Sequence, residues 1–179
     1  MDYQYEHAVA ILRRTPATLT ALLRGLPDAW TKSTEGPDTW SALDIVGHLL
    51  NGEETDWIVR TRILLDHGEK QPFDSVNRTA MFDKYKGFSL DQLLAAFEQA
   101  RAKNLATLSE LQITPEKLTL TGTHPAFGTV TLSQLLATWV VHDLNHIGQV
   151  VEVMSRQYDE AVGPWRAYLN ILTRPILTE

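Results

Sequence analysis

Residues 131–158 read TLSQLLATWVVHDLNHIGQVVEVMSRQY, and this stretch decides the fold. One face of the helix that it predicts carries residues spaced alternately by four and three positions: Leu135, Trp139, His142, His146, Gln149 and Val153. A stripe with this spacing packs against the neighbouring helices of a bundle. The stretch therefore predicts a long amphipathic helix with two histidines on its inward face.

Three other stretches, 3–26, 41–65 and 89–111, have the same helical periodicity. Pro16 lacks a backbone N–H and crowds the preceding turn, so it predicts a kink or break near Thr15. Capping residues mark the starts of the last three helices: Ser41 with Asp44, Ser89 with Gln92, and Thr131 with Gln134. Four long helices predict an all-α protein.

The connections between these helices differ in character. Residues 67–88 form a long connection, for which Phe73, Phe82 and Tyr85 offer apolar anchors. Residues 112–130 are rich in Gly, Pro and Thr and predict at most a short extended piece, without a sheet, and 163–172 predict a short closing helix. The fold class that we expect is a four-helix bundle, antiparallel with one long crossover connection, as one domain over residues 1–179.

Composition excludes several classes of function. The net charge is −6 and no basic cluster offsets it, so we expect no nucleic-acid partner. The chain has no cysteine, so any metal must be held by His, Asp or Glu. The N-terminal stretch MDYQYEHAVAILRR lacks the basic-then-apolar order of a signal peptide, and no run reaches the roughly 20 apolar residues of a membrane span. We therefore expect a cytoplasmic protein with no membrane partner.

His142 and His146 are four residues apart, so their side chains stack on consecutive turns of the helix with their roots roughly 6 Å apart. Two imidazoles placed in this way can converge on one ion with bonds of about 2 Å. Hydrogen-bonded core histidines are the alternative, and the pair alone does not decide between them. A third inward histidine favours the metal: His48 lies on the apolar stripe of the second helix with Ile45 and Leu49.

The stretches TWSALDIVGHL at 39–49 and HDLNHIGQ at 142–149 resemble the DinB-like superfamily, also known as YfiT-like metalloenzymes. RTPATLTALLRGLPDAW, HPAFGTVTLSQLLATW and GPWRAYLNIL are similar to that family too, so the resemblance covers nearly the whole chain. It implies a four-helix bundle that binds one divalent ion, nickel or zinc, through His48, His142 and His146. It also implies a homodimer.

Three neutral nitrogen ligands leave positions open on a divalent ion, as in catalytic sites. Such an ion can lower the pKa of bound water to about 7 or ionise a thiol. The resemblance favours an S-transferase that uses a low-molecular-weight thiol, such as bacillithiol or mycothiol, on a small-molecule substrate, and a hydrolase comes second. A metal-binding or stress-associated bundle without turnover is the alternative from another class.

Other polar residues give weaker predictions. Gln149 lies one turn beyond His146 and is a candidate to hydrogen-bond a ligand or a bound water, or else an edge residue of the bundle. His124 lies in a loop that could cover the site, although a local turn role is favoured. Arg60 and Arg62 could steer an anionic substrate or simply form an exposed face.

Several residues are expected to take no part in the site. A solvated or capping role is predicted for Asp143 and Asn145, and Glu53 and Glu54 miss the His48 face. Surface positions are predicted for His7 and His67. Core or dimer packing is predicted for the tryptophans Trp40, Trp57, Trp139 and Trp165.

Overall fold

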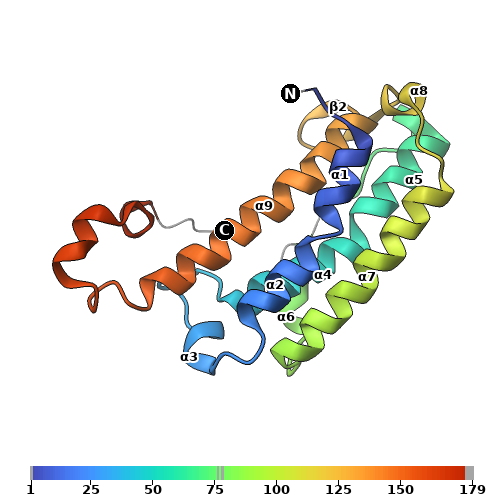
Figure 1. Cartoon of the computed structure of the whole chain (residues 1–179). Helices are drawn as coiled ribbons and strands as arrows, with labels where there is room; N and C mark the ends of the chain where they lie inside the picture. The colour runs from blue at the N-terminus through green and yellow to red at the C-terminus, as the bar shows by residue number, and fades with distance from the viewer. Residues whose placement is uncertain (1, 76, 78, 176–179) are drawn as a thin grey trace.

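The computed structural model describes residues 2–75, 77 and 79–175, and it is built from four long helical rods (Figure 1). Val76 and Arg78, which belong to the predicted long connection, and the two ends of the predicted domain lie outside the described residues. The rods are α1 (Tyr5–Leu12) with α2 (Thr15–Leu23), α4 (Ala42–Thr55) with α5 (Trp57–His67), α7 (Leu90–Glu110), and α9 (Leu132–Arg156). The predicted four-helix bundle is confirmed.

Short elements lie between and after the rods. They are α3 (Asp28–Thr31), η1 (Gly68–Lys70), α6 (Ala80–Lys84), α8 (Pro115–Leu118), β1 (Thr121–His124), β2 (Gly128–Thr131), η2 (Gly163–Tyr168) and η3 (Asn170–Thr173). None of the helices in the described part of the chain has both the length and the hydropathy that a bilayer crossing requires.

The crossover connection sets the direction of the rods (Figure 1). The starts of α4 and α7 pack in one core cluster with the ends of α2 and α9. The α4–α5 rod and α7 therefore run parallel to each other and antiparallel to α2 and α9. Two consecutive parallel rods need a connection that returns along the bundle, and residues 68–89, which include α6, provide it.

Local sequence signals account for where the rods begin and break. Capping boxes start α4, α7 and α9, as predicted. The first rod breaks between Leu12 and Thr15, as Pro16 predicts. The second rod, predicted to be continuous, also breaks, because Asp56 has non-helical backbone angles. Beyond that break the Trp57 indole packs closely on Gly52. A Cβ added at position 52 would lie 3.2 Å from the Nε1 atom of Trp57.

The prediction that residues 112–130 contain no sheet is wrong, because β1 and β2 pair as an antiparallel hairpin. Its turn depends on two residues. His124 Nδ1 accepts hydrogen bonds from the backbone N–H groups of Ala126 and Phe127, and Gly128 has a φ of +73°, which side-chain-bearing residues rarely adopt. The predicted closing helix is also wrong in detail: η2 and η3 are two 3-10 helices separated by Leu169, whose backbone angles are non-helical.

The apolar core has two clusters with a polar layer between them. One contains Leu19, Ile45, Leu94 and Val153, among others, and the second contains Leu12, Trp57, Leu108 and Trp139, among others. The buried polar residues of this layer lie in sequence between members of the two clusters on the α4–α5 rod, on α7 and on α9. They are Glu53, Arg101, Asn104 and Asp143. Three of the four predicted core tryptophans are buried, whereas Trp165 is 71% exposed.

The polar layer is centred on Arg101 of α7, which is 2% exposed. Its guanidinium donates to both carboxylate oxygens of Asp143, at 2.6 and 3.0 Å, and to Glu53 Oε1 at 2.8 Å. It also donates to the Leu12 carbonyl at 2.7 Å. Glu53 accepts further hydrogen bonds from Asn104 and from the Trp139 indole. One side chain thus connects four rods.

This layer corrects one prediction. The solvated or capping role predicted for Asp143 is wrong, since the residue is fully buried against Arg101. Glu53 was predicted only to miss the face of His48; it is buried, and burial raises the pKa of its carboxyl although the charge of Arg101 opposes that shift. Buried charges are stable only when their partners are present, so the layer is a strong constraint on the packing of α4, α7 and α9.

We expect Arg101→Met to lower the free energy of unfolding by about 3–5 kcal/mol, because it leaves two buried carboxylates without their cationic partner. Urea unfolding followed by circular dichroism measures the change. Lys103→Met is the matched control, since Lys103 is exposed on the same helix. A loss smaller than about 1 kcal/mol for Arg101→Met would contradict this role.

Candidate metal centre

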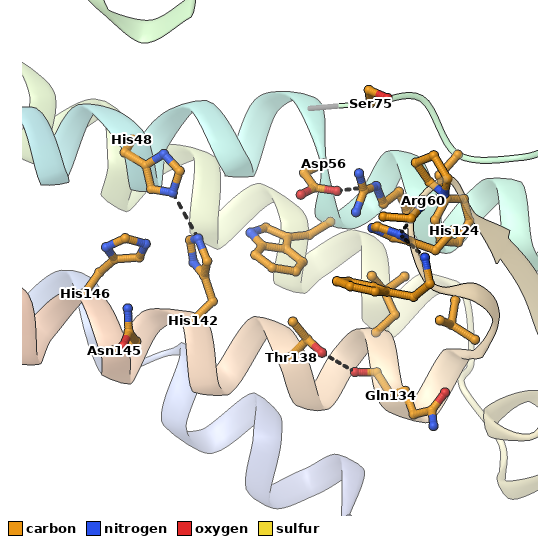
Figure 2. Close-up of a pocket in the computed structure, with 17 residues that line it drawn as sticks. His48, Asp56, Arg60, Ser75, His124, Gln134, Thr138, His142, Asn145 and His146 are labelled. Atoms are coloured by element: carbon orange, nitrogen blue, oxygen red, sulfur yellow. Dashed lines mark hydrogen bonds and ion pairs between the residues drawn. The ribbon is translucent and has the colours of Figure 1, made fainter. Parts of the chain in front are cut away.

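The structure brings His48, His142 and His146 together on the inner faces of α4 and α9 (Figure 2). The Nε2 atoms of His48 and His142 lie 3.0 Å apart. The ring centroid of His146 is 4.6 Å from that of His48 and 4.4 Å from that of His142. One ring nitrogen from each residue falls within 4.8 Å of the others. Residues 94 positions apart in the sequence therefore form one cluster.

Two tryptophans pack against the rings of the cluster. The Trp40 ring lies 4.8 Å from the His48 ring and stacks at 6.3 Å on the His146 ring. The Trp57 ring meets His142 edge-on at 5.1 Å and stacks on Trp139 at 5.6 Å. His48 and His146 are buried and His142 is half-buried. The aromatic rings restrict the rotamers of the histidines, so the cluster is held in place by packing.

Gln149 orients one histidine, and its predicted position beside the cluster agrees with the structure. His146 Nδ1 lies 2.8 Å from Gln149 Oε1. An amide oxygen only accepts hydrogen bonds, so Nδ1 carries the proton in this pair and Nε2 has a lone pair. Histidine ligands in metal sites are held in the same way by an outer hydrogen bond.

The donor set fits a divalent transition-metal ion. Two imidazole nitrogens bound to one zinc ion at about 2 Å each would lie roughly 3.3 Å apart. The 3.0 Å between His48 and His142 is close to that value, and the third ring is within reach. Imidazole nitrogen suits zinc, nickel, copper and iron alike, so the donor set does not select among them.

The cluster lies at one end of an open cavity of about 680 Å³ (Figure 2). Apolar side chains from α5, α9, the hairpin and the connection after η1 form much of its wall, among them Trp57, Phe73, Phe127, Val130 and Leu135. Polar residues also reach it: Asp56, Arg60, Ser75, His124, Gln134, Thr138 and Asn145. The cavity has the size of a small-molecule site.

The other end of the cavity carries an ion pair. Arg60 Nε lies 2.6 Å from Asp56 Oδ1, four residues earlier on the second rod. Burial raises the pKa of Asp56 despite the positive charge of Arg60. His124 lines the same end, and burial, with a smaller contribution from the Arg60 charge, lowers the pKa of its imidazole.

Comparison with known proteins assigns the chain to a family. The family model of the DinB superfamily matches residues 11–150. The chain belongs to the DinB superfamily. The structure is also similar to YfiT from Bacillus subtilis, with a TM-score of 0.72 and 21% identity over 84% of this chain and 86% of that one. YfiT is described as a "probable metal-dependent hydrolase with an unusual four-helix bundle topology". No curated protein matches the sequence.

For this DinB protein, the sequence indicated more of the residues at the histidine end of the cavity than at the end that carries the Asp56–Arg60 pair. The structure brings the three histidines together, with Gln149 against His146. His124 has the predicted turn role and also lines the cavity. Asn145 is exposed as predicted, yet it lines the cavity too. His7 and His67 are exposed as predicted.

Asp56 is one of the cavity residues to which the sequence analysis gave no site role, as are Ser75 and Thr138. Its position four residues before Arg60 is a detectable signal, because oppositely charged residues at this spacing pair on a helix. What the spacing does not reveal is that the pair faces a cavity. That depends on the break between α4 and α5, which the sequence did not predict.

We expect the imidazole of His124 to titrate below the ordinary midpoint of about 6.5, because its surroundings disfavour the charged form. The unfolded chain then binds a proton more readily than the folded one, so this group costs stability as the pH falls below that midpoint. NMR titration of the His124 Cε1–H signal measures the shift. Arg60→Gln should raise the midpoint, and a folded-state midpoint at or above that of the urea-unfolded chain would contradict the assignment.

Proposed function

We propose that this DinB protein is a metal-dependent enzyme that acts on a small molecule, with His48, His142 and His146 holding one divalent ion. The observation that carries the proposal is the convergence of three ring nitrogens, within 4.8 Å of one another, in the wall of an open cavity. Structural zinc sites are closed by four protein ligands, whereas catalytic sites keep a position open. Among the described residues, the cluster contains three side chains that can bind a metal, which is the number found in catalytic sites.

A divalent ion bound there would supply Lewis acidity, which acidifies a water molecule or a thiol and polarises a substrate oxygen. Other residues of the chain orient the histidines and pack around them. The Gln149 amide oxygen accepts the proton of His146 Nδ1, so that the lone pair of Nε2 is available to bind a metal. Trp40 packs against His48 and Trp57 against His142, and such apolar surroundings strengthen electrostatic interactions within the site.

Hydrolysis is the first candidate reaction, and the description of YfiT as a probable metal-dependent hydrolase supports it. Transfer of a low-molecular-weight thiol, which the sequence resemblance favours, is the second candidate. The cavity volume of about 680 Å³ is compatible with two small reactants. Nickel or zinc as the metal, the homodimer and the cytoplasmic location stay predictions.

We expect the protein, purified without a nickel column, to bind one equivalent of zinc or nickel, and the His142→Ala/His146→Ala variant to bind none. Gln149→Leu should weaken binding about 10–100-fold, since it removes the hydrogen bond that orients His146. Elemental analysis and competition with a chromophoric chelator measure these values. Circular dichroism verifies that the variants remain helical. Equal metal binding by the wild type and the double variant would refute the site.

The reaction class is tested with the metal-loaded protein. We expect metal-dependent turnover of small ester or amide substrates without added thiol, and its loss in the His142→Ala/His146→Ala variant. Mass spectrometry of the products distinguishes addition of water from addition of a thiol when bacillithiol or mycothiol is supplied. A metal-loaded protein that is inactive on both kinds of substrate would favour the non-catalytic metal-binding bundle.

A further inference from the structure

Arg60 is held in the cavity wall as a fixed guanidinium. Its side chain is only 11% exposed. Its Nε pairs with Asp56 Oδ1, one Nη donates to the backbone carbonyl of Asp74 at 3.1 Å, and its Cζ lies 5.3 Å from the centre of the Phe73 ring. A guanidinium has five N–H donors in a planar fork, so these contacts orient the group and leave further donors for a ligand.

His124 presents a second donor next to Arg60. Its Nδ1 accepts the backbone hydrogen bonds of the hairpin turn, so in the neutral ring the proton is on Nε2. The His124 ring packs edge-on against Phe73 at 6.3 Å, and Arg60 lies over the same phenyl ring. Figure 2 places both residues at the end of the cavity away from the three histidines.

The charges at this end favour a ligand with a single negative charge. Arg60 and Asp56 together are neutral, and the pKa of His124 is lowered, so the surroundings offer N–H donors without a surplus of positive charge. A carboxylate accepts a bidentate pair from a guanidinium and carries one charge. A phosphate ester carries up to two charges, and the second would be repelled by Asp56.

We propose that Arg60 and His124 form a carboxylate-binding subsite, so that the small-molecule substrate binds with its carboxylate there and its reacting group at the three histidines. The apolar wall between the two ends, with Trp57, Phe127 and Leu135, accommodates a hydrocarbon or aromatic body. The substrate orientation rests on the proposed function, whereas carboxylate binding by Arg60 does not.

The test uses phenylacetate as the probe and the full-length protein stripped of metal with EDTA, with affinity measured by NMR chemical-shift titration. We expect the Asp56→Asn/Arg60→Gln variant to bind phenylacetate about tenfold more weakly or worse, because charge-assisted hydrogen bonds are lost. Removing both partners avoids leaving a buried carboxylate alone. Arg62→Gln, an exposed position on the same helix, is the matched control and should bind like the wild type.

Two further arms separate this proposal from others. His142→Ala/His146→Ala should keep phenylacetate binding, so that loss of the metal site and loss of the carboxylate subsite are distinguishable. Phenyl phosphate should bind more weakly than phenylacetate, and benzyl alcohol more weakly still. Four results would each overturn the proposal: no binding of phenylacetate by the wild type, binding only in the presence of metal, unchanged affinity in the Asp56→Asn/Arg60→Gln variant, or tighter binding of phenyl phosphate.

Arg60→Lys is the second variant if the double variant does not fold. It should also bind phenylacetate more weakly, because it keeps the charge but loses the planar fork.

Discussion

The packing of the bundle depends on one buried cation. The Arg101 guanidinium joins Asp143 of α9, Glu53 of α4 and the last carbonyl of α1. Apolar contacts tolerate small sliding of helices, but a guanidinium that contacts two carboxylates through directed hydrogen bonds does not. The cost of an unpaired buried charge excludes other helix registers, and this makes the polar layer a source of specificity as well as stability.

The same cation determines where the histidines lie. Asp143 directly follows His142 on α9, and Glu53 follows His48 by five residues on α4. When Arg101 holds both carboxylates, it fixes the register of the two helices that carry the metal-site candidates. A metal site requires ligand positions accurate to a few tenths of an ångström, and rigid helices held in a fixed register provide that accuracy. The buried charges therefore support the histidine cluster by fixing the register of the helices that carry it.

Sequence reasoning predicted the bundle and the cluster because both follow from helical periodicity. His142 and His146 share a stripe with Leu135 and Trp139, and His48 shares one with Ile45. It failed on Asp143 because a single stripe is narrower than the buried face of a helix that contacts several neighbours. Arg101 lies on the apolar spacing of Leu94, Phe97, Asn104 and Leu108, so a charged core was detectable. The hairpin was not, since its turn depends on how His124 accepts backbone hydrogen bonds.

The break between α4 and α5 gives the cavity two chemically different ends. Along a continuous helix, His48 and residues seven or eleven positions later would share one face. The non-helical angles of Asp56 shift that relation, so Trp57 packs beside His142 while Asp56 and Arg60 pair farther along the wall. The hairpin then places His124 over the same end. A ligand that spans the cavity meets nitrogen donors for a metal at one end and N–H donors for an anion at the other. Under the proposed function, this polarity would orient a substrate in a way that three histidines alone would not.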